Sequence, residues 1–110
     1  MSLSVYYVDA FTDKPFHGNS AAVVILERWL TEQTMQSIAT ENNLSETAFL
    51  CPGQDGIFDI RWFSPLTEID FCGHATLASA FILFALHAVS ELKFRAPAVD
   101  VISVLRRADV

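Results

Sequence analysis

The chain has 110 residues, of which 52% are hydrophobic and 18% are charged. This composition is too apolar for a disordered chain and predicts one domain with its own core. The net charge of −6 is the wrong sign for a surface that binds nucleic acid or an anionic membrane. The first four residues are uncharged and no long apolar stretch follows them, so we expect no secretory signal and a cytoplasmic protein.

The first half of the chain predicts strands on either side of one helix. Residues 3–10 and 21–26 are rich in β-branched, aromatic and small apolar residues, and the second run has the pattern of a strand buried on both faces. Thr31 is placed to cap a short amphipathic helix that runs to about Asn42. The hydrophobic period then changes to two, which predicts a strand over residues 44–50.

The second half predicts further strands around an apolar helix. Residues 57–63 alternate as a strand, and residues 69–71 form a short extended piece. Residues 75–89 carry no charge, and their apolar side chains cover every side of a helical wheel, so we expect a buried core helix. It is too short for a bilayer, which needs about 20 apolar residues. Residues 92–94 and 99–105 return to strand-like patterns.

Glu46 is the first residue that could carry chemistry. In its predicted strand it points the same way as Leu44, Ala48 and Leu50, so its carboxyl group would lie among aliphatic side chains. A desolvated carboxyl group can both hold and release a proton, as a general acid/base must. The alternative is a glutamate at the strand edge whose head reaches water, since charged residues are seldom fully buried.

Residues 72–76, with the sequence CGHAT, lie where extended chain enters the apolar helix. The backbone N–H groups of Gly73, His74 and Ala75 would face outward there and attract a carboxylate or phosphate. His74 could add a hydrogen bond or a proton, and Cys72 is a candidate thiol whose ionised form the same helix end favours. The alternative is that Gly73 only permits the turn and His74 only caps the helix.

Asn19 follows Gly18 in a turn between the first two predicted strands. Its amide could orient a polar substrate or satisfy the turn's own backbone. Only Cys72 and His74 are close together among the cysteines and histidines, so the sequence predicts no metal site. The sequence has no phosphate-binding loop, dinucleotide fingerprint or G-x-S-x-G elbow, which argues against a kinase, a dehydrogenase or a common hydrolase.

A series of ordered motifs gives the chain its most specific signature. They are VDAFT at residues 8–12, PFHGNSAAVV at residues 15–24, NLSETAF at residues 43–49 and FCGHAT at residues 71–76. Together they resemble the phenazine-biosynthesis PhzF-like family. The resemblance extends from Ser4 to about Phe94 and matches the N-terminal half of a family member.

The resemblance implies an α+β fold similar to that of diaminopimelate epimerase. In that fold a mixed or antiparallel barrel-like sheet wraps around a central buried apolar helix. Family members have two such pseudo-symmetric domains, with the active site in the cleft between them. Residues 1–110 would be a single N-terminal domain without the second one, and we expect two copies to pair as a homodimer so that each supplies one wall of the cleft.

The resemblance also implies a cofactor-independent isomerase or epimerase that acts on a small carboxylic acid. A carboxylate removes a proton from carbon and returns it elsewhere, and Glu46 matches the family's catalytic glutamate. His74 matches a histidine that holds substrate and assists the proton, and the helix start at Gly73 matches a carboxylate-binding element. Asn19 falls in a stretch similar to a substrate-contacting turn. Cys72 stands at a position similar to a catalytic thiol of the superfamily's cysteine-type racemases.

Two features depart from the family pattern. Ser20 stands where the family usually has proline. The Gly-Ser-type turn and the acidic residue of the second domain, which would complete the cleft, have no counterpart in these 110 residues. The alternative function is therefore a non-catalytic module, a truncated half-protein that binds a small acid or only dimerises.

Overall fold

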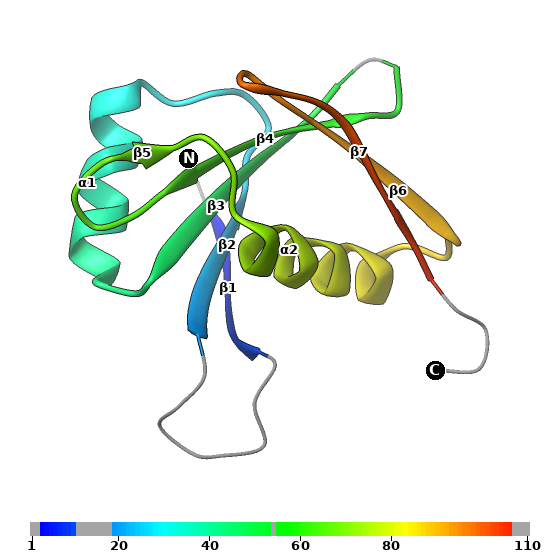
Figure 1. The fold of residues 1–110 in the computed structure, drawn as a ribbon, viewed down its shortest axis with the longest axis horizontal. Coiled ribbons are helices and arrows are strands. Elements are labelled where there is room, and N and C mark those ends of the chain that lie inside the picture. Colours follow the sequence, from blue (N-terminus) through cyan, green and yellow to red (C-terminus); the bar gives the residue numbers. More distant parts are fainter. Residues whose placement is uncertain (1–2, 11–18, 54, 107–110) are drawn as a thin grey trace.

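The structure is a computed structural model that describes residues 3–10, 19–53 and 55–106 (Figure 1). Two strands, a helix, three strands, a second helix and two more strands follow one another along these residues. Their bounds are β1 Ser4–Ala10, β2 Asn19–Ile25, α1 Glu32–Asn42, β3 Glu46–Pro52, β4 Phe58–Phe63, β5 Glu68–Ile69, α2 Gly73–Leu86, β6 Glu91–Ala96 and β7 Val99–Leu105.

The strands form one mixed sheet in the order β1-β2-β3-β4-β6-β7, with β5 paired to β4. The pairs β2–β3 and β4–β6 are parallel, and the other pairs are antiparallel. The sheet curves, with α2 inside the curve and α1 on the opposite face (Figure 1). This arrangement confirms the α+β fold with a mixed sheet around an apolar helix that the sequence predicts.

Strand β3 is buried on both faces because it lies between the two helices. Ala48 and Leu50 belong to the core on the α2 side, whereas Phe49 belongs to the core on the α1 side. The predicted alternation of directions is therefore confirmed, although the alternation does not separate buried from exposed residues here. Glu46, two residues before Ala48, faces α2.

Some element boundaries differ from the prediction. The strand predicted from residue 44 begins at Glu46, because Asn43 ends α1 in a left-handed conformation with φ 53° and the chain bends before it extends. The extended piece predicted over residues 69–71 is the two-residue strand Glu68–Ile69. Asn19 lies at the first position of β2, with its backbone opposite Ala10, and not in the preceding turn.

Helix α1 begins where its capping residue predicts. The Thr34 N–H donates to Thr31 Oγ1 at 3.1 Å and so satisfies one of the backbone donors at the helix start. We expect Thr31→Ala to lower the free energy of unfolding by about 1 kcal/mol, measured by urea denaturation. Ser37→Ala, at an exposed position inside the same helix, is the control and should not destabilise the protein. Equal losses in the two variants would contradict a capping role for Thr31.

Helix α2 is apolar on every side, but the sheet covers only part of it. Ala75, Ala78 and Leu83 are buried, whereas Leu77 is 47% exposed and Phe81 is 65% exposed. The expectation of burial on all sides is therefore wrong for this chain, because the described strands enclose the helix from one side only. Among the described residues, no helix has both the length and the apolar character needed to cross a membrane.

Candidate active site

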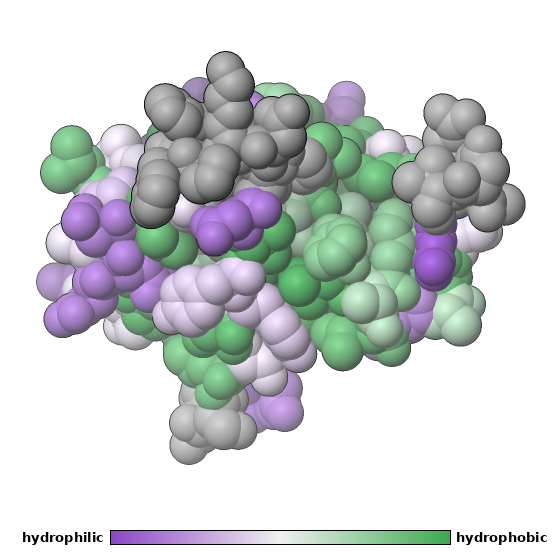
Figure 2. All heavy atoms as spheres, turned by 90° about the horizontal axis from the view of Figure 1, so that it is seen from below, coloured by the Kyte–Doolittle hydropathy of each residue, from purple (hydrophilic) through white to green (hydrophobic). Residues whose placement is uncertain are grey.

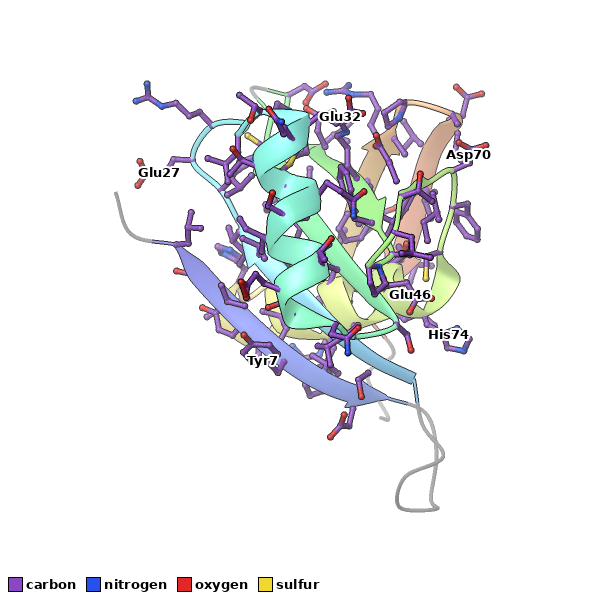
Figure 3. The ribbon with its side chains drawn as sticks, turned by 90° about the vertical axis from the view of Figure 1, so that its left-hand side faces the viewer. Tyr7, Glu27, Glu32, Glu46, Asp70 and His74 are labelled. Carbon is purple, nitrogen blue, oxygen red and sulfur yellow. The ribbon has the colours of Figure 1, made fainter. Side chains whose placement is uncertain are left out.

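Glu46 stands at the start of β3, close to the first turn of α2 (Figure 3). Its backbone is opposite Ala21 of the parallel neighbour β2, and its side chain is half-buried. The carboxyl oxygen Oε2 is buried and accepts a hydrogen bond from none of the described residues. A buried carboxyl oxygen without a donor is costly unless something else supplies one, so this atom points to a missing partner or ligand.

Cys72 lies between Glu46 and the helix start. It is the N-cap residue of α2 and is only 7% exposed. Burial raises the pKa of the Cys72 thiol, and the charge of Glu46 and a hydrogen bond with its carboxyl group also raise that pKa. The backbone N–H groups of Ala75 and His74 act in the opposite direction by hydrogen bonding to the sulfur.

The raised pKa of Cys72 contradicts the expectation that the helix end favours its thiolate. Two backbone donors do face the sulfur, but burial and the neighbouring carboxylate outweigh them, so the pKa lies above its ordinary value. Cys72 is therefore a neutral thiol at neutral pH. Both cysteines are free thiols in the structure.

A buried network holds the start of α2 in place. Thr76 Oγ1 donates to the Cys72 carbonyl at 2.8 Å and accepts a hydrogen bond from Trp62 Nε1 at 3.1 Å. The Trp62 ring packs edge-on against Phe71, with 5.5 Å between the ring centroids. Sequence reasoning missed Trp62, although a buried tryptophan needs an acceptor for its N–H and Thr76 stands in the CGHAT motif.

The other predicted residues at this helix start are Gly73, His74 and Ala75. His74 is exposed in the first turn and lies on the same side of the molecule as Glu46, whereas Ala75 is buried (Figure 3). Gly73 does not have a positive φ. Apart from its chain neighbours, only the Phe71 ring, 3.7 Å away, would lie near a Cβ at this position among the described residues. Neither the turn nor packing by the described side chains therefore requires a glycine at this position.

Asn19 can be placed only by its backbone. It precedes Ala21 by two positions on β2, so its main chain lies at the same end of the sheet as Glu46. Its side chain lies outside the described residues, as does the rest of the predicted turn.

A hollow of about 430 Å³ is lined mainly by residues of β4 and β6. None of the predicted site residues lines it. Arg61 and Arg95 line it, but both guanidinium groups are already paired. Arg61 binds Glu68 at 2.6 Å, and Arg95 binds Asp59 at 2.9 Å. These pairs leave little unbalanced positive charge for an anionic ligand. In the described part of the chain, no three or more His, Cys, Asp or Glu residues are grouped so that they could hold a metal ion.

The contact between Glu46 and Cys72 can be tested by titration. Glu46→Gln removes the negative charge that disfavours the thiolate, so the pKa of Cys72 should fall. The titration can be followed by NMR of the cysteine Cβ carbons. Asp59→Asn is the matched control, because the charge of Asp59 raises the pKa of Cys51, and that variant should shift Cys51 but not Cys72. An unchanged Cys72 pKa in Glu46→Gln would show that the two groups are not neighbours.

Known proteins that are similar to this chain belong to one family. Residues 8–101 match the family described as phenazine biosynthesis-like protein. An uncharacterized isomerase of Pseudomonas aeruginosa is 57% identical over 83 residues, which are 76% of this chain and 32% of that protein. The human phenazine biosynthesis-like domain-containing protein is 50% identical over 91 residues, which are 76% of this chain and 32% of that protein.

Solved structures agree with these matches. A PhzF-family phenazine biosynthesis protein from Enterococcus faecalis superimposes with a TM-score of 0.88 and 48% sequence identity. The superposition covers 98% of this chain and 42% of that chain. The present chain spans about a third of the length of the curated relatives that it matches.

Proposed function

The chain belongs to the phenazine biosynthesis-like PhzC-PhzF family, and on that premise we propose that it isomerises or epimerises a small carboxylic acid by moving a proton at carbon. Glu46 is the acid/base that moves the proton. The observation that carries this proposal is the buried Oε2 of Glu46, which has no donor among the described residues and lies beside the start of α2. No cofactor takes part in the proposed reaction.

The substrate's carboxylate would lie against the N-terminal end of α2. Backbone N–H groups and the positive end of the helix dipole favour an anion there, and Gly73 has no side chain that would obstruct its approach. His74, exposed in the same turn, would add a hydrogen bond to the substrate or supply a proton. The substrate would thus be held with its reacting carbon near Glu46.

The chemical step would begin at Glu46. Its carboxylate takes a proton from the substrate carbon, the C–H bond breaks, and the electron pair delocalises into the adjacent unsaturated group or carboxylate. The helix end stabilises the negative charge that develops. Glu46 then gives the proton to another carbon in an isomerisation, whereas in an epimerisation a second acid on the opposite face gives a proton to the same carbon. The same carboxyl group thus takes part in both halves of this cycle, first as a base and then as an acid.

A second polypeptide would supply the other wall of the site. The described residues surround Glu46 from the side of β3 and α2, and the chain spans only part of the length of its relatives. We propose that this second polypeptide is another copy of the same chain, in a homodimer.

Deuterium exchange tests the proposed reaction directly. The protein is incubated in D₂O with a panel of amino acids, hydroxy acids and unsaturated acids, and NMR or mass spectrometry measures deuterium at carbon. We expect at least one acid to gain solvent deuterium, and treatment with a chelator should not change the rate. Binding of an acid without exchange would contradict the proposal and favour the non-catalytic small-acid-binding module.

A further inference from the structure

Helix α2 begins without the side chains that usually stabilise a helix start. Its N-cap residue is Cys72, which is not among the usual capping residues, and no acidic side chain stands in its first turn. Helix α1 differs, because Thr31 caps it and Glu32 stands in its first turn. Hydrophobic side chains gather on the face that contains α2 (Figure 2). The start of α2 therefore needs support of another kind.

Thr76 supplies this support from the buried side of the helix. Its backbone N–H and its hydroxyl Oγ1 both donate to the Cys72 carbonyl, at 3.1 Å and 2.8 Å. Thr76 thus closes the first turn of α2 with two hydrogen bonds instead of one. Trp62 Nε1 donates to the same hydroxyl at 3.1 Å. Because an indole nitrogen can only donate, the hydroxyl accepts from Trp62 and directs its own hydrogen to Cys72.

Trp62 connects this turn to the strand that carries Glu46. Trp62 lies in β4, and its backbone is opposite Ala48 of β3. Glu46 stands two residues before Ala48, so both point to the α2 side of the sheet. The hydrogen bonds from Trp62 to Thr76 and from Thr76 to Cys72 therefore join the paired strands to the helix start. Because these groups are buried, breaking either bond is costly, and the first turn stays at one position relative to Glu46.

We propose that Thr76 is a positioning residue of the proposed reaction, whose hydroxyl, held by Trp62, keeps the first turn of α2 beside Glu46. This inference rests on the proposed function, in which the substrate's carboxylate lies against that turn. An acidic side chain in the first turn would also stabilise the helix, but it would repel the carboxylate. A buried hydroxyl holds the turn without placing a negative charge near the substrate.

Ser79 offers a matched control one turn further along α2. It is fully buried, and its hydroxyl donates to the Ala75 carbonyl at 2.7 Å. This bond has the same form as the bond from Thr76 to Cys72. It joins two residues of one helix and does not reach the sheet. Loss of the Ser79 hydroxyl should therefore leave the position of the first turn unchanged.

Deuterium exchange at a saturating concentration of the acid tests the effect on the reaction. Thr76→Val keeps the branched side chain and removes the hydroxyl, and it should lower the exchange rate by about 10-fold to 100-fold through misplacement of the substrate. Thr76→Ser restores the hydroxyl and should recover most of the rate. Ser79→Ala should exchange at the wild-type rate. Circular dichroism gives the folded fraction of each variant, and rates are compared per folded molecule. Equal losses in Thr76→Val and Ser79→Ala would overturn the inference.

Amide hydrogen exchange measures the first turn without the reaction. The N–H of residue 76 is bonded to the Cys72 carbonyl, and the N–H of His87 is bonded to the Leu83 carbonyl at the other end of α2. Thr76→Val should lower the protection of the residue-76 amide by about 5-fold, the effect of one hydrogen bond, and leave that of His87 unchanged. Equal losses at both ends would overturn the inference.

A second variant keeps the inference testable if Thr76→Val does not fold. Trp62→Phe removes the donor and leaves the Thr76 hydroxyl in place, and it should also lower the protection of the residue-76 amide. The exchange rate with the acid should fall in this variant as well. Unchanged protection of that amide in a folded Trp62→Phe protein would overturn the inference.

The two measurements separate this inference from the proposed reaction. A wild-type protein that exchanges deuterium, with a Thr76→Val variant that exchanges equally fast, would overturn the inference and leave the reaction standing. A wild-type protein that exchanges with no acid would contradict the reaction. The protection of the residue-76 amide would then decide alone whether Thr76 holds the start of α2.

Discussion

Glu46→Gln should lower the rate of deuterium exchange into a bound acid by about 100-fold to 10,000-fold, the usual contribution of a positioned acid/base group. Glutamine keeps the shape of the side chain and removes the group that accepts the proton. The measurement compares initial rates of deuterium incorporation for the wild-type protein and the variant with the acid that exchanges fastest. Binding of that acid should change far less than its exchange, because the helix start that would hold the carboxylate is unaltered.

The control for this result is Glu41→Gln, which makes the same chemical change at an exposed position of α1. It should exchange at the wild-type rate. Glu46→Asp keeps the carboxyl group but withdraws it by one carbon, so it should retain part of the activity. If Glu46→Gln exchanges as fast as the wild-type protein, Glu46 is not the base, and another group near the helix start must move the proton.

Trp62→Ala should destabilise the protein by about 3–5 kcal/mol, the typical loss when a large aromatic side chain is removed from a core. Trp62 is 1% exposed, and its ring packs against Phe71. Its loss also removes the hydrogen bond from Nε1 to Thr76, which holds the first turn of α2. Because small domains have a total stability of about 5–15 kcal/mol, we expect a large fall in the urea midpoint and loss of the site.

Two variants separate the contributions at this position. Trp62→Phe keeps most of the ring and loses only the N–H donor, so it should cost about 1 kcal/mol from the hydrogen bond together with a smaller packing loss. Trp29→Ala removes the other tryptophan, which is 36% exposed, and should cost much less than Trp62→Ala. Equal losses for Trp29→Ala and Trp62→Ala would contradict the central position of Trp62 in the core.

Local patterns were sufficient to predict most of the elements. The strands β1, β2, β4 and β7 fall close to the predicted residues, because each is a short run with a clear hydrophobic pattern. Thr31 gave the start of α1 because a capping hydroxyl acts on the nearest backbone donors. The position of Glu46 facing α2 likewise followed from the period of two in β3.

Contacts between residues distant in sequence account for the features that the sequence did not predict. The uncharged sequence of α2 shows that the helix needs a cover on every side, but it does not show how much of that cover the same chain provides. The pKa of Cys72 depends on Glu46, a residue distant in sequence that the fold brings alongside. The bond between Trp62 and Thr76 joins two elements that no local period connects. Each of these features depends on the way in which the sheet curves around the helix.

The proposed reaction needs more than the start of one helix. Ala75 and His74 already direct their N–H groups toward the Cys72 sulfur, so the anion site depends on the remaining N–H groups and on the His74 side chain. In the proposed reaction, Glu46 supplies the group that exchanges a proton. The proposed chemistry needs both features in one place, and the proposed second copy would exclude water from that place.

NMR mapping of ligand binding tests the central claim most directly. The exchanging acid is titrated into isotope-labelled protein, and the shifts of backbone amides and side-chain carboxyl groups are recorded. Our account predicts that the largest shifts occur at the amide of Gly73, at the His74 imidazole and at the carboxyl group of Glu46. Shifts confined to the hollow lined by Arg61 and Arg95, with Glu46 unaffected, would contradict it.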